Sequence, residues 1–344
     1  MNICTWIYCD GVHEESDYPQ VGHRSFSRKF QEVYWRCVAV FFATSRRMNP
    51  TARHLLYTNA SEIPSVDGFD LNGFLRERLG VEVVRMELTY RTPPGYYGSW
   101  KNQFYLFDIL KSIAAAEEDD TEPYLVLDSD CVWLRSAGEI EKAIGRHGLL
   151  TMTADVDHDT EFVMNGLSRR QMKGLYEELL GHPLPGIPYY YGGEWFAANA
   201  GEFRRVMAEL GGVWEQSMQR FAGGKAKFNE EAQMLSYVYD KLGYESRTAN
   251  VFIKRIWTQL TGFNNVEEQD RQLTLWHLPS EKKLGIARLY AEVIREESAF
   301  WQTDGGAAYV DYMAAVMGVP KRSVAKTLKD ARALIFHKLL QRVN

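Results

Sequence analysis

The first half of the chain alternates short apolar runs with longer segments in which apolar residues recur at helical spacing. Each apolar run predicts a strand: residues 3–9, 53–59, 81–88, 148–156, and the run from Pro123 that ends at Asp128. Helical patterns lie between these runs, at residues 25–47, 71–80 and 99–116. Strands that alternate with helices are typical of a mostly parallel sheet flanked by helices, so the pattern predicts an α/β fold.

The second half is less regular. It contains a strand-like aromatic run at 188–199, a helix at 201–222, a helix beginning near Asn229, and a short strand at 273–279. Residues 90–99, YRTPPGYYGS, are too rich in proline and glycine for a regular element and predict a loop. Without repeats or low-complexity linkers, we expect one domain over residues 1–285 and a helical C-terminal extension, residues 286–344, packed on it.

The overall composition is that of an ordinary globular protein, with 45% hydrophobic and 25% charged residues among 344. The net charge of −5 argues against a nucleic-acid binder, which would carry a basic surplus. The four cysteines have neither zinc-site nor disulfide-framework spacing, so we expect buried, reduced thiols. No signal peptide and no run of about 18 apolar residues is found. These features together predict a cytoplasmic protein.

Two carboxylates, Asp128 and Asp130, follow a buried apolar run in the segment VLDSDCV. Two residues apart on an extended segment, their side chains point to the same face, and burying both charges is costly without a cation. Carboxylate oxygens suit Mg²⁺ or Mn²⁺. The carboxyl end of a strand in an open α/β sheet is also where ligands bind. The pattern therefore predicts a metal site. A strand that ends at the surface, with both carboxylates in water, would show the same sequence pattern.

The same segment fits the D-x-D-x-[TV] motif of haloacid-dehalogenase-type phosphatases. In such an enzyme Asp128 would be the nucleophile and Asp130 the acid and base. That motif normally belongs to the first strand of its domain, whereas three predicted strands precede it here. A later acidic pair, which these enzymes need, is not evident in the sequence either.

Nucleotide-sugar glycosyltransferases of the GT-A fold provide a broader resemblance. Their D-x-D motif also follows a long alternating α/β segment, and the preceding helix SWKNQFYLFDIL resembles the one that offers them a basic residue. The resemblance implies that Asp128 and Asp130 bind Mn²⁺ or Mg²⁺ under a diphosphate, and that Ser129 and Lys101 belong to the same donor-binding site. It places the end of the first strand near the nucleotide base, at Tyr8, Cys9 and Asp10.

The segment LWHLPSEKKLG is similar to the H-x-x-G-x-x-K-P-W segment of glycogenin-like retaining transferases. This similarity implies that His277 is a third metal ligand and that Lys282 or Lys283 binds the diphosphate. It also favours a retaining reaction. The segment departs from the motif at Ser280 and at Leu284-Gly285. A histidine buried in the core, with no ligand role, remains the alternative for His277.

Three glutamates between these motifs are candidate catalytic residues. Glu194 follows two glycines in an otherwise apolar strand, where an acid is costly unless it binds something. Glu230 and Glu231 open a predicted helix, and one of them could support an oxocarbenium ion or orient the acceptor hydroxyl. Their alternative role is to favour the helix N-terminus, with Asn229 as the N-cap.

The C-terminal segment 321–344 is basic and carries apolar residues at helical spacing. Its charged residues are Lys321, Arg322, Lys326, Lys329, Arg332, Lys338 and Arg342 against the single acid Asp330. We expect a helix packed on the domain with a solvated basic face. Peripheral attachment to the inner face of an anionic membrane, where a lipid-linked acceptor would lie, is the alternative.

The function expected from these features is metal-dependent transfer of a sugar from a nucleotide-diphosphate sugar, with UDP preferred, to a glycan or other hydroxyl acceptor. Two alternatives stay open. One is a phosphatase with Asp128 as nucleophile, and the other is a carbohydrate- or nucleotide-binding protein without catalytic activity.

Overall fold

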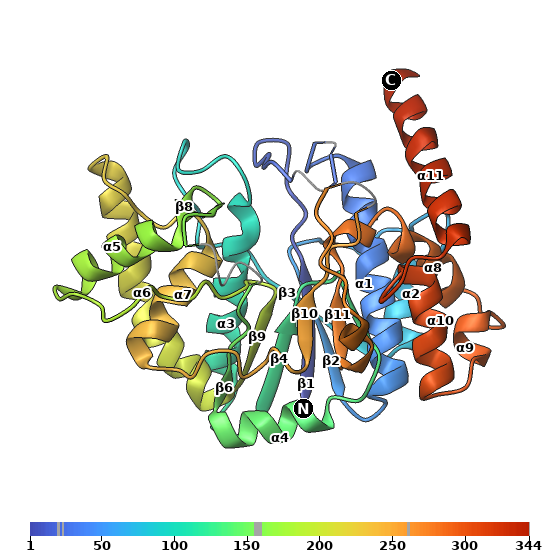
Figure 1. Cartoon of the computed structure of the whole chain (residues 1–344), viewed down its shortest axis with the longest axis horizontal. Coiled ribbons are helices and arrows are strands. Elements are labelled where there is room, and N and C mark those ends of the chain that lie inside the picture. The colour runs from blue at the N-terminus through green and yellow to red at the C-terminus, as the bar shows by residue number, and fades with distance from the viewer. Residues whose placement is uncertain (19–20, 23, 155–159, 260–261, 344) are drawn as a thin grey trace.

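The computed structural model describes residues 1–343 except 19–20, 23, 155–159 and 260–261, with side chains as far as Ala333. Its centre is a six-stranded sheet in the order β3-β2-β1-β4-β9-β6 (Figure 1). These strands are β1 (Asn2–Ile7), β2 (Arg53–Thr58), β3 (Val81–Arg85), β4 (Pro123–Leu127), β6 (Leu149–Leu150) and β9 (Trp195–Asn199). β1 pairs in parallel with β2 and β4, and β2 with β3, whereas β9 runs antiparallel to β4 and β6. The predicted mixed, mostly parallel α/β sheet is therefore confirmed.

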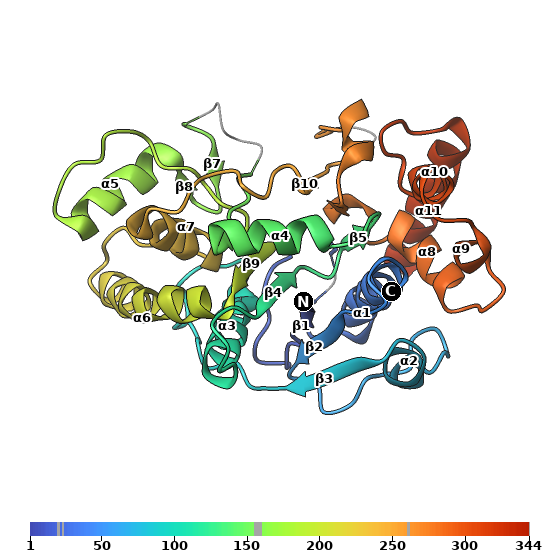
Figure 2. The ribbon, with the colours of Figure 1, turned by 90° about the horizontal axis from the view of Figure 1, so that it is seen from below.

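Helices cover both faces of this sheet (Figures 1 and 2). One face is packed by α1 (Arg28–Met48) with α8 (Gly285–Val293), and the other by α3 (Tyr105–Ala116), α6 (Ala200–Ala222) and α7 (Glu231–Leu242). Alternate residues of each central strand enter opposite cores: Leu125 and Leu127 face α1, whereas Tyr124 and Val126 face α3. Burial on both faces explains why these strands read as continuous apolar runs.

A second, three-stranded sheet lies beside the end of β4. Its order is β10-β11-β5, from β10 (Ile253–Arg255), β11 (Leu275–His277) and β5 (Cys131–Trp133). β5 follows β4 almost at once, so residues 128–130 form a turn between two sheets. The expectation that Asp128 and Asp130 lie on one extended segment is thus wrong. The chain turns because β5 pairs antiparallel with β11, with Cys131 opposite His277.

Several elements differ from the pattern-based expectations. The sequence did not indicate α4 (Gly138–His147), α5 (Arg169–Leu180), the hairpin β7–β8 (Val163–Met164 and Leu167–Ser168) or β10. The strand expected at 148–156 is reduced to β6, and residues 155–156 lie outside the described part. The helix expected at 99–116 begins two residues later, at Lys101, with a 3₁₀ turn (η2, Lys101–Phe104) before α3. α2 (Leu71–Gly73) continues as a wider turn, η1 (Phe74–Arg78). The expected N-cap is also displaced: it is Glu230, not Asn229.

The C-terminal part consists of helices beside α1. After the 3₁₀ turns η3 (Glu268–Gln272) and η4 (Pro279–Glu281) come α8, α9 (Ala299–Gln302), α10 (Ala307–Met317) and α11 (Val324–Val343). α8 packs on α1, and α11 extends away from the body in Figure 1. Within the described residues, no helix is long and apolar enough to cross a membrane.

The first turns of α11 present the opposite face from the one expected. Lys326 and Asp330 are buried, whereas Val324 and Leu328 are exposed. The reason is a buried ionic cluster: the Nζ of Lys326 donates to Glu281 and to Asp330, at 2.8 Å each. Within the part of α11 whose side chains are described, as far as Ala333, charged groups therefore make the buried contacts with the body.

Candidate metal centre and ligand cavity

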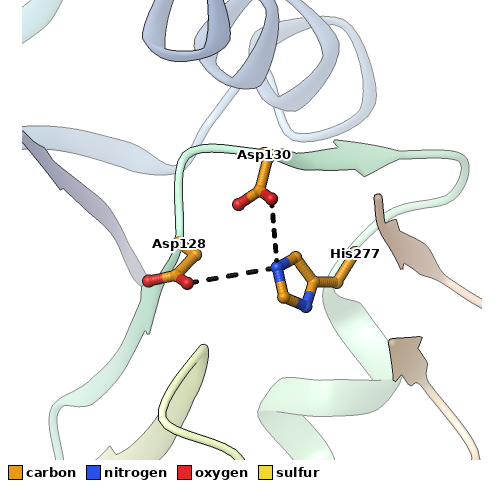
Figure 3. A group of neighbouring side chains, drawn as sticks. All are labelled: Asp128, Asp130 and His277. Atoms are coloured by element: carbon orange, nitrogen blue, oxygen red, sulfur yellow. Dashed lines mark ion pairs between the residues drawn. The ribbon is translucent and has the colours of Figure 1, made fainter. Parts of the chain in front are cut away.

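Three side chains meet at the junction of the two sheets (Figure 3). Asp128 directly follows β4, Asp130 lies in the turn to β5, and His277 ends β11. The Nε2 atom of His277 lies 3.2 Å from Asp130 Oδ2 and 4.0 Å from Asp128 Oδ2. One donor atom from each residue fits within 4.8 Å of the others. The structure thus brings together the three residues that the sequence predicted as ligands. They are close because β5 pairs with β11.

The donor set suits a divalent cation. In an octahedral site with bonds of about 2.1 Å, neighbouring donors are about 3 Å apart. The 3.2 Å between His277 Nε2 and Asp130 Oδ2 is close to this value, whereas the 4.0 Å to Asp128 Oδ2 is longer. Two carboxylates favour Mg²⁺ or Mn²⁺, and the imidazole nitrogen favours Mn²⁺ of the two. Burial alone would lower the pKa of His277, but Asp130 and Glu194 raise it to about 9. A bound metal would therefore displace a proton from His277 at neutral pH.

The other ring nitrogen of His277 is held by Glu194. Glu194 Oε1 lies 3.1 Å from His277 Nδ1 and accepts from Arg255 Nε at 2.6 Å. Although burial acts in the opposite direction, Arg255 and His277 hold the pKa of Glu194 well below its usual range. A carboxylate committed to two cations is poorly suited to be the catalytic acid expected at this position. Its geometry is that of a residue that orients a metal-binding histidine.

We expect Glu194→Gln to weaken Mn²⁺ binding about 10–100-fold, the usual effect of losing such an orienting carboxylate. The affinity would be measured by calorimetric titration of the metal-free protein. Glu215→Gln, an exposed glutamate of α6, is the matched control and should bind Mn²⁺ like the wild type. Unchanged affinity in a folded Glu194→Gln protein would show that Glu194 serves only the ion pair with Arg255.

Of the three lysines expected near a diphosphate, only Lys282 lies at the site. Its Nζ donates to Asp130 Oδ2, and the ammonium is buried. Lys101 is tied to the N-terminal loop through its Nζ and Glu15 O at 3.0 Å, and Lys283 donates to Val21 O at 2.6 Å. Neither lines the cavity described below. The structure therefore does not support a direct role for Lys101 or Lys283.

The metal-ligand group opens into a cavity of about 680 Å³, within the usual range for a small-molecule site. Aromatic side chains form the wall beside β1 and α1: Trp6, Tyr8, Tyr18, Phe30, Tyr34 and Trp100. Ser129 also lines the cavity. Cys9 and Asp10, expected there, lie behind the wall, where the backbone of Cys9 bonds to Asn59 and Asp10 accepts from Asn102. A flat aromatic ligand would fit this wall.

The opposite side of the cavity contains a pair of buried glutamates at the start of α7. Glu230 accepts from the Tyr190 hydroxyl and from the Asn165 amide, and burial raises its pKa to about 7. Glu231 lies beside Gly193, where any larger side chain would meet its carboxyl group. Burial and the adjacent Glu230 raise the pKa of Glu231 well above its usual range. Since Glu231 Oε2 has no hydrogen-bond partner among the described residues, it is the freer of the two carboxyls.

Sequence reasoning missed several residues of the site. Arg255 sits in the apolar stretch VFIKRIW, where a buried arginine needs an acid, and this was the available signal. Asn165 precedes Gly166, and an Asn-Gly pair is a strong hairpin signal. Tyr190 could be recognised only as one of three consecutive tyrosines, and nothing in the sequence singles it out.

The comparisons with known proteins add no family. No protein-family model matches the sequence, and a search of curated proteins finds no match. What the chain can do must therefore be argued from the cavity itself.

Proposed function

We propose that the protein transfers a sugar from a nucleotide-diphosphate sugar, with UDP as the preferred nucleotide, to a hydroxyl acceptor in an Mn²⁺- or Mg²⁺-dependent reaction. One observation carries the proposal. Asp128, Asp130 and His277 converge beside Lys282, at one end of a cavity that has an aromatic wall on one side and a buried glutamate pair on the other. The metal centre suits the diphosphate of such a donor, the aromatic wall suits its base, and the glutamate pair suits its sugar.

The diphosphate of the donor would bind at the end of the cavity that contains the candidate metal centre and Lys282. Asp128, Asp130 and His277 would hold the metal, which supplies positive charge to the departing diphosphate. Lys282 would turn from Asp130 toward a phosphate oxygen once the metal satisfies that carboxylate. The nucleotide base then fits the aromatic wall, with Tyr8 at the end of β1. Burial of these groups strengthens each charge interaction relative to water.

The glutamate side then receives the sugar and the acceptor. In the reaction a bond forms between the acceptor oxygen and the anomeric carbon, while the bond from that carbon to the diphosphate oxygen breaks. In the retaining form that we favour, the acceptor proton passes to the departing oxygen. Ionised Glu231 would hold the acceptor hydroxyl and stabilise the positive charge at the anomeric carbon. Glu230, bound by Tyr190 and Asn165, positions this segment.

A phosphatase is the second candidate, and one observation weighs against it. In that chemistry Asp130 must take up and release a proton near neutral pH. Although burial acts in the opposite direction, Lys282 and His277 hold the pKa of Asp130 well below its usual range. The position of the motif agrees with this, since it follows the fourth strand of the chain and not the first.

The test is ligand-induced thermal stabilisation of the metal-free protein. With Mn²⁺ and UDP together, we expect a rise in melting temperature larger than the sum of the separate effects, reversed by EDTA, because ligands that bind only the folded state stabilise it. Incubation with the UDP-sugar that stabilises most should release free sugar slowly, and an aryl phosphate should not be hydrolysed. Aryl phosphate hydrolysis without nucleotide binding would instead support the phosphatase.

A further inference from the structure

The outer part of the cavity is apolar and exposed, unlike its charged interior. Phe162 and Val163, at the start of the hairpin β7–β8, line it together with Phe263, and they are 49%, 57% and 52% exposed. Trp257 also lines the cavity and stacks edge-on against Phe263, with ring centroids 6.0 Å apart. We call these four residues the apolar rim. Large apolar side chains grouped at a binding site, rather than scattered singly, indicate an apolar ligand surface.

One side of the rim is fixed in place by the glutamate segment. The hairpin β7–β8 turns through Asn165 and Gly166, both with left-handed φ, as a two-residue hairpin turn requires. Asn229 donates to Asn165 O at 2.9 Å, and Gln233 donates to Met164 O at 3.1 Å. The loop that exposes Val163 is thus anchored directly to the start of α7, which carries Glu231.

This anchoring places a polar part of the cavity, at Glu231, next to an apolar part, at the rim. A ligand that reaches Glu231 with a hydroxyl group continues outward past the hairpin and over the rim. Rings such as Phe162 and Phe263 can stack on a sugar face, but Phe162, Val163 and Phe263 have no side-chain group that could hydrogen-bond to the hydroxyl groups of a plain glycan. An alkyl or aryl group would instead bury apolar surface there.

We propose that the acceptor is amphipathic: a hydroxyl-bearing head at Glu231 is joined to an alkyl or aryl group that lies on the apolar rim. This inference rests on the proposed function, since it assigns the acceptor of that reaction. The rim residues are then the specificity determinants, and the acceptor class is a lipid-linked or aryl-linked alcohol rather than a free polysaccharide.

The test compares two probes that share one polar head, methyl β-D-glucoside and octyl β-D-glucoside, the latter below its micelle concentration. Binding is measured by saturation-transfer NMR and titration on the full chain with Mn²⁺ and UDP present. We expect the octyl compound to bind at least about tenfold more tightly, since each buried methylene group contributes measurably. Its alkyl protons should receive the strongest saturation.

Variants then locate the contact. The double variant Val163→Ser/Phe263→Ser should lose the advantage of the octyl compound, whereas Val251→Ser should keep it. Val251 is a matched control because it is an apolar residue, 69% exposed, that does not line the cavity. Equal binding of the two glucosides, or an undiminished octyl advantage in the double variant, would overturn the inference. So would a rim that proves to hold a second copy of the chain, seen as a dimer that the double variant dissociates.

The result is separable from the proposed function. If Mn²⁺ and UDP stabilise the protein but the octyl compound has no advantage, the inference fails while the transferase proposal stands. If the octyl compound binds at the rim but Mn²⁺ and UDP have no effect, the transferase proposal fails and the rim is a binding site for another purpose.

Discussion

Asp130→Asn is expected to abolish Mn²⁺ binding and to lower turnover by at least about a thousandfold, the scale of losing an electrostatic element of the transition state. Asp130 is the residue at which the proposed metal, His277 and Lys282 all meet. Binding would be measured by calorimetry at pH 7.5 in buffers of different ionisation enthalpy. For the wild type we expect a released proton, because the pKa of His277 is about 9 in the metal-free protein.

Stability must be separated from metal binding in this variant. Asparagine leaves the buried ammonium of Lys282 without its carboxylate, so the metal-free variant should melt at a lower temperature. The double variant Asp130→Asn/Lys282→Met removes both charges and should recover much of that loss without recovering Mn²⁺ binding. Asp304→Asn, at an exposed position, controls for the substitution itself. Normal Mn²⁺ dependence in Asp130→Asn would exclude this carboxylate as a ligand.

Glu231→Gln is expected to lower kcat by about a hundredfold or more while leaving the Mn²⁺- and UDP-dependent stabilisation intact. The wild-type rate should increase with pH as Glu231 ionises, since its pKa is raised by burial, and the variant should lose this dependence. The measurement is kcat across the pH range at saturating donor.

The same variant should gain stability, and the sign follows from linkage. A glutamate whose pKa is higher in the folded than in the unfolded state destabilises the fold increasingly as pH rises above the unfolded value near 4.5. Without metal, Glu231→Gln should therefore melt above the wild type at pH 8, with a smaller difference at pH 5. Glu297→Gln, an exposed control, should show no such trend. A variant that melts lower at pH 8 would mean that Glu231 is ionised and well paired.

Much of the architecture was predictable because its signals are local. Buried parallel strands appear as apolar runs, and α1 and α3 show apolar residues at helical spacing, so the order of the elements from β1 to β4 could be predicted from the sequence. The residues of the candidate metal centre were also predictable: Asp128 and Asp130 are separated by one residue in the sequence, and His277 was identified through a resemblance.

The remaining parts depend on long-range pairing. Glu194 looks like an unpaired acid in the sequence, and only the approach of β10 supplies Arg255 from 61 residues away. Likewise, the sequence Asp128-Ser129-Asp130 is compatible with both a turn and an extended segment. Only the pairing of β5 with β11 determines that it is a turn. Lys101 does not line the cavity, and its ammonium donates instead to the backbone oxygen of Glu15, a contact that the sequence does not reveal.

The buried charges that fasten α11 have a consequence for biosynthesis. Glu281 immediately precedes Lys282, the lysine of the metal site, and its carboxylate is held by Lys326, 45 residues later in the chain. As the ribosome releases the polypeptide, the strands of the central sheet emerge long before Lys326 does. Until Arg322 and Lys326 have both emerged, Glu281 lacks the two cations that pair with it, and the turn that presents Lys282 lacks these contacts. The nascent chain should thus acquire its sheet first and a competent ligand cavity only near the end of synthesis.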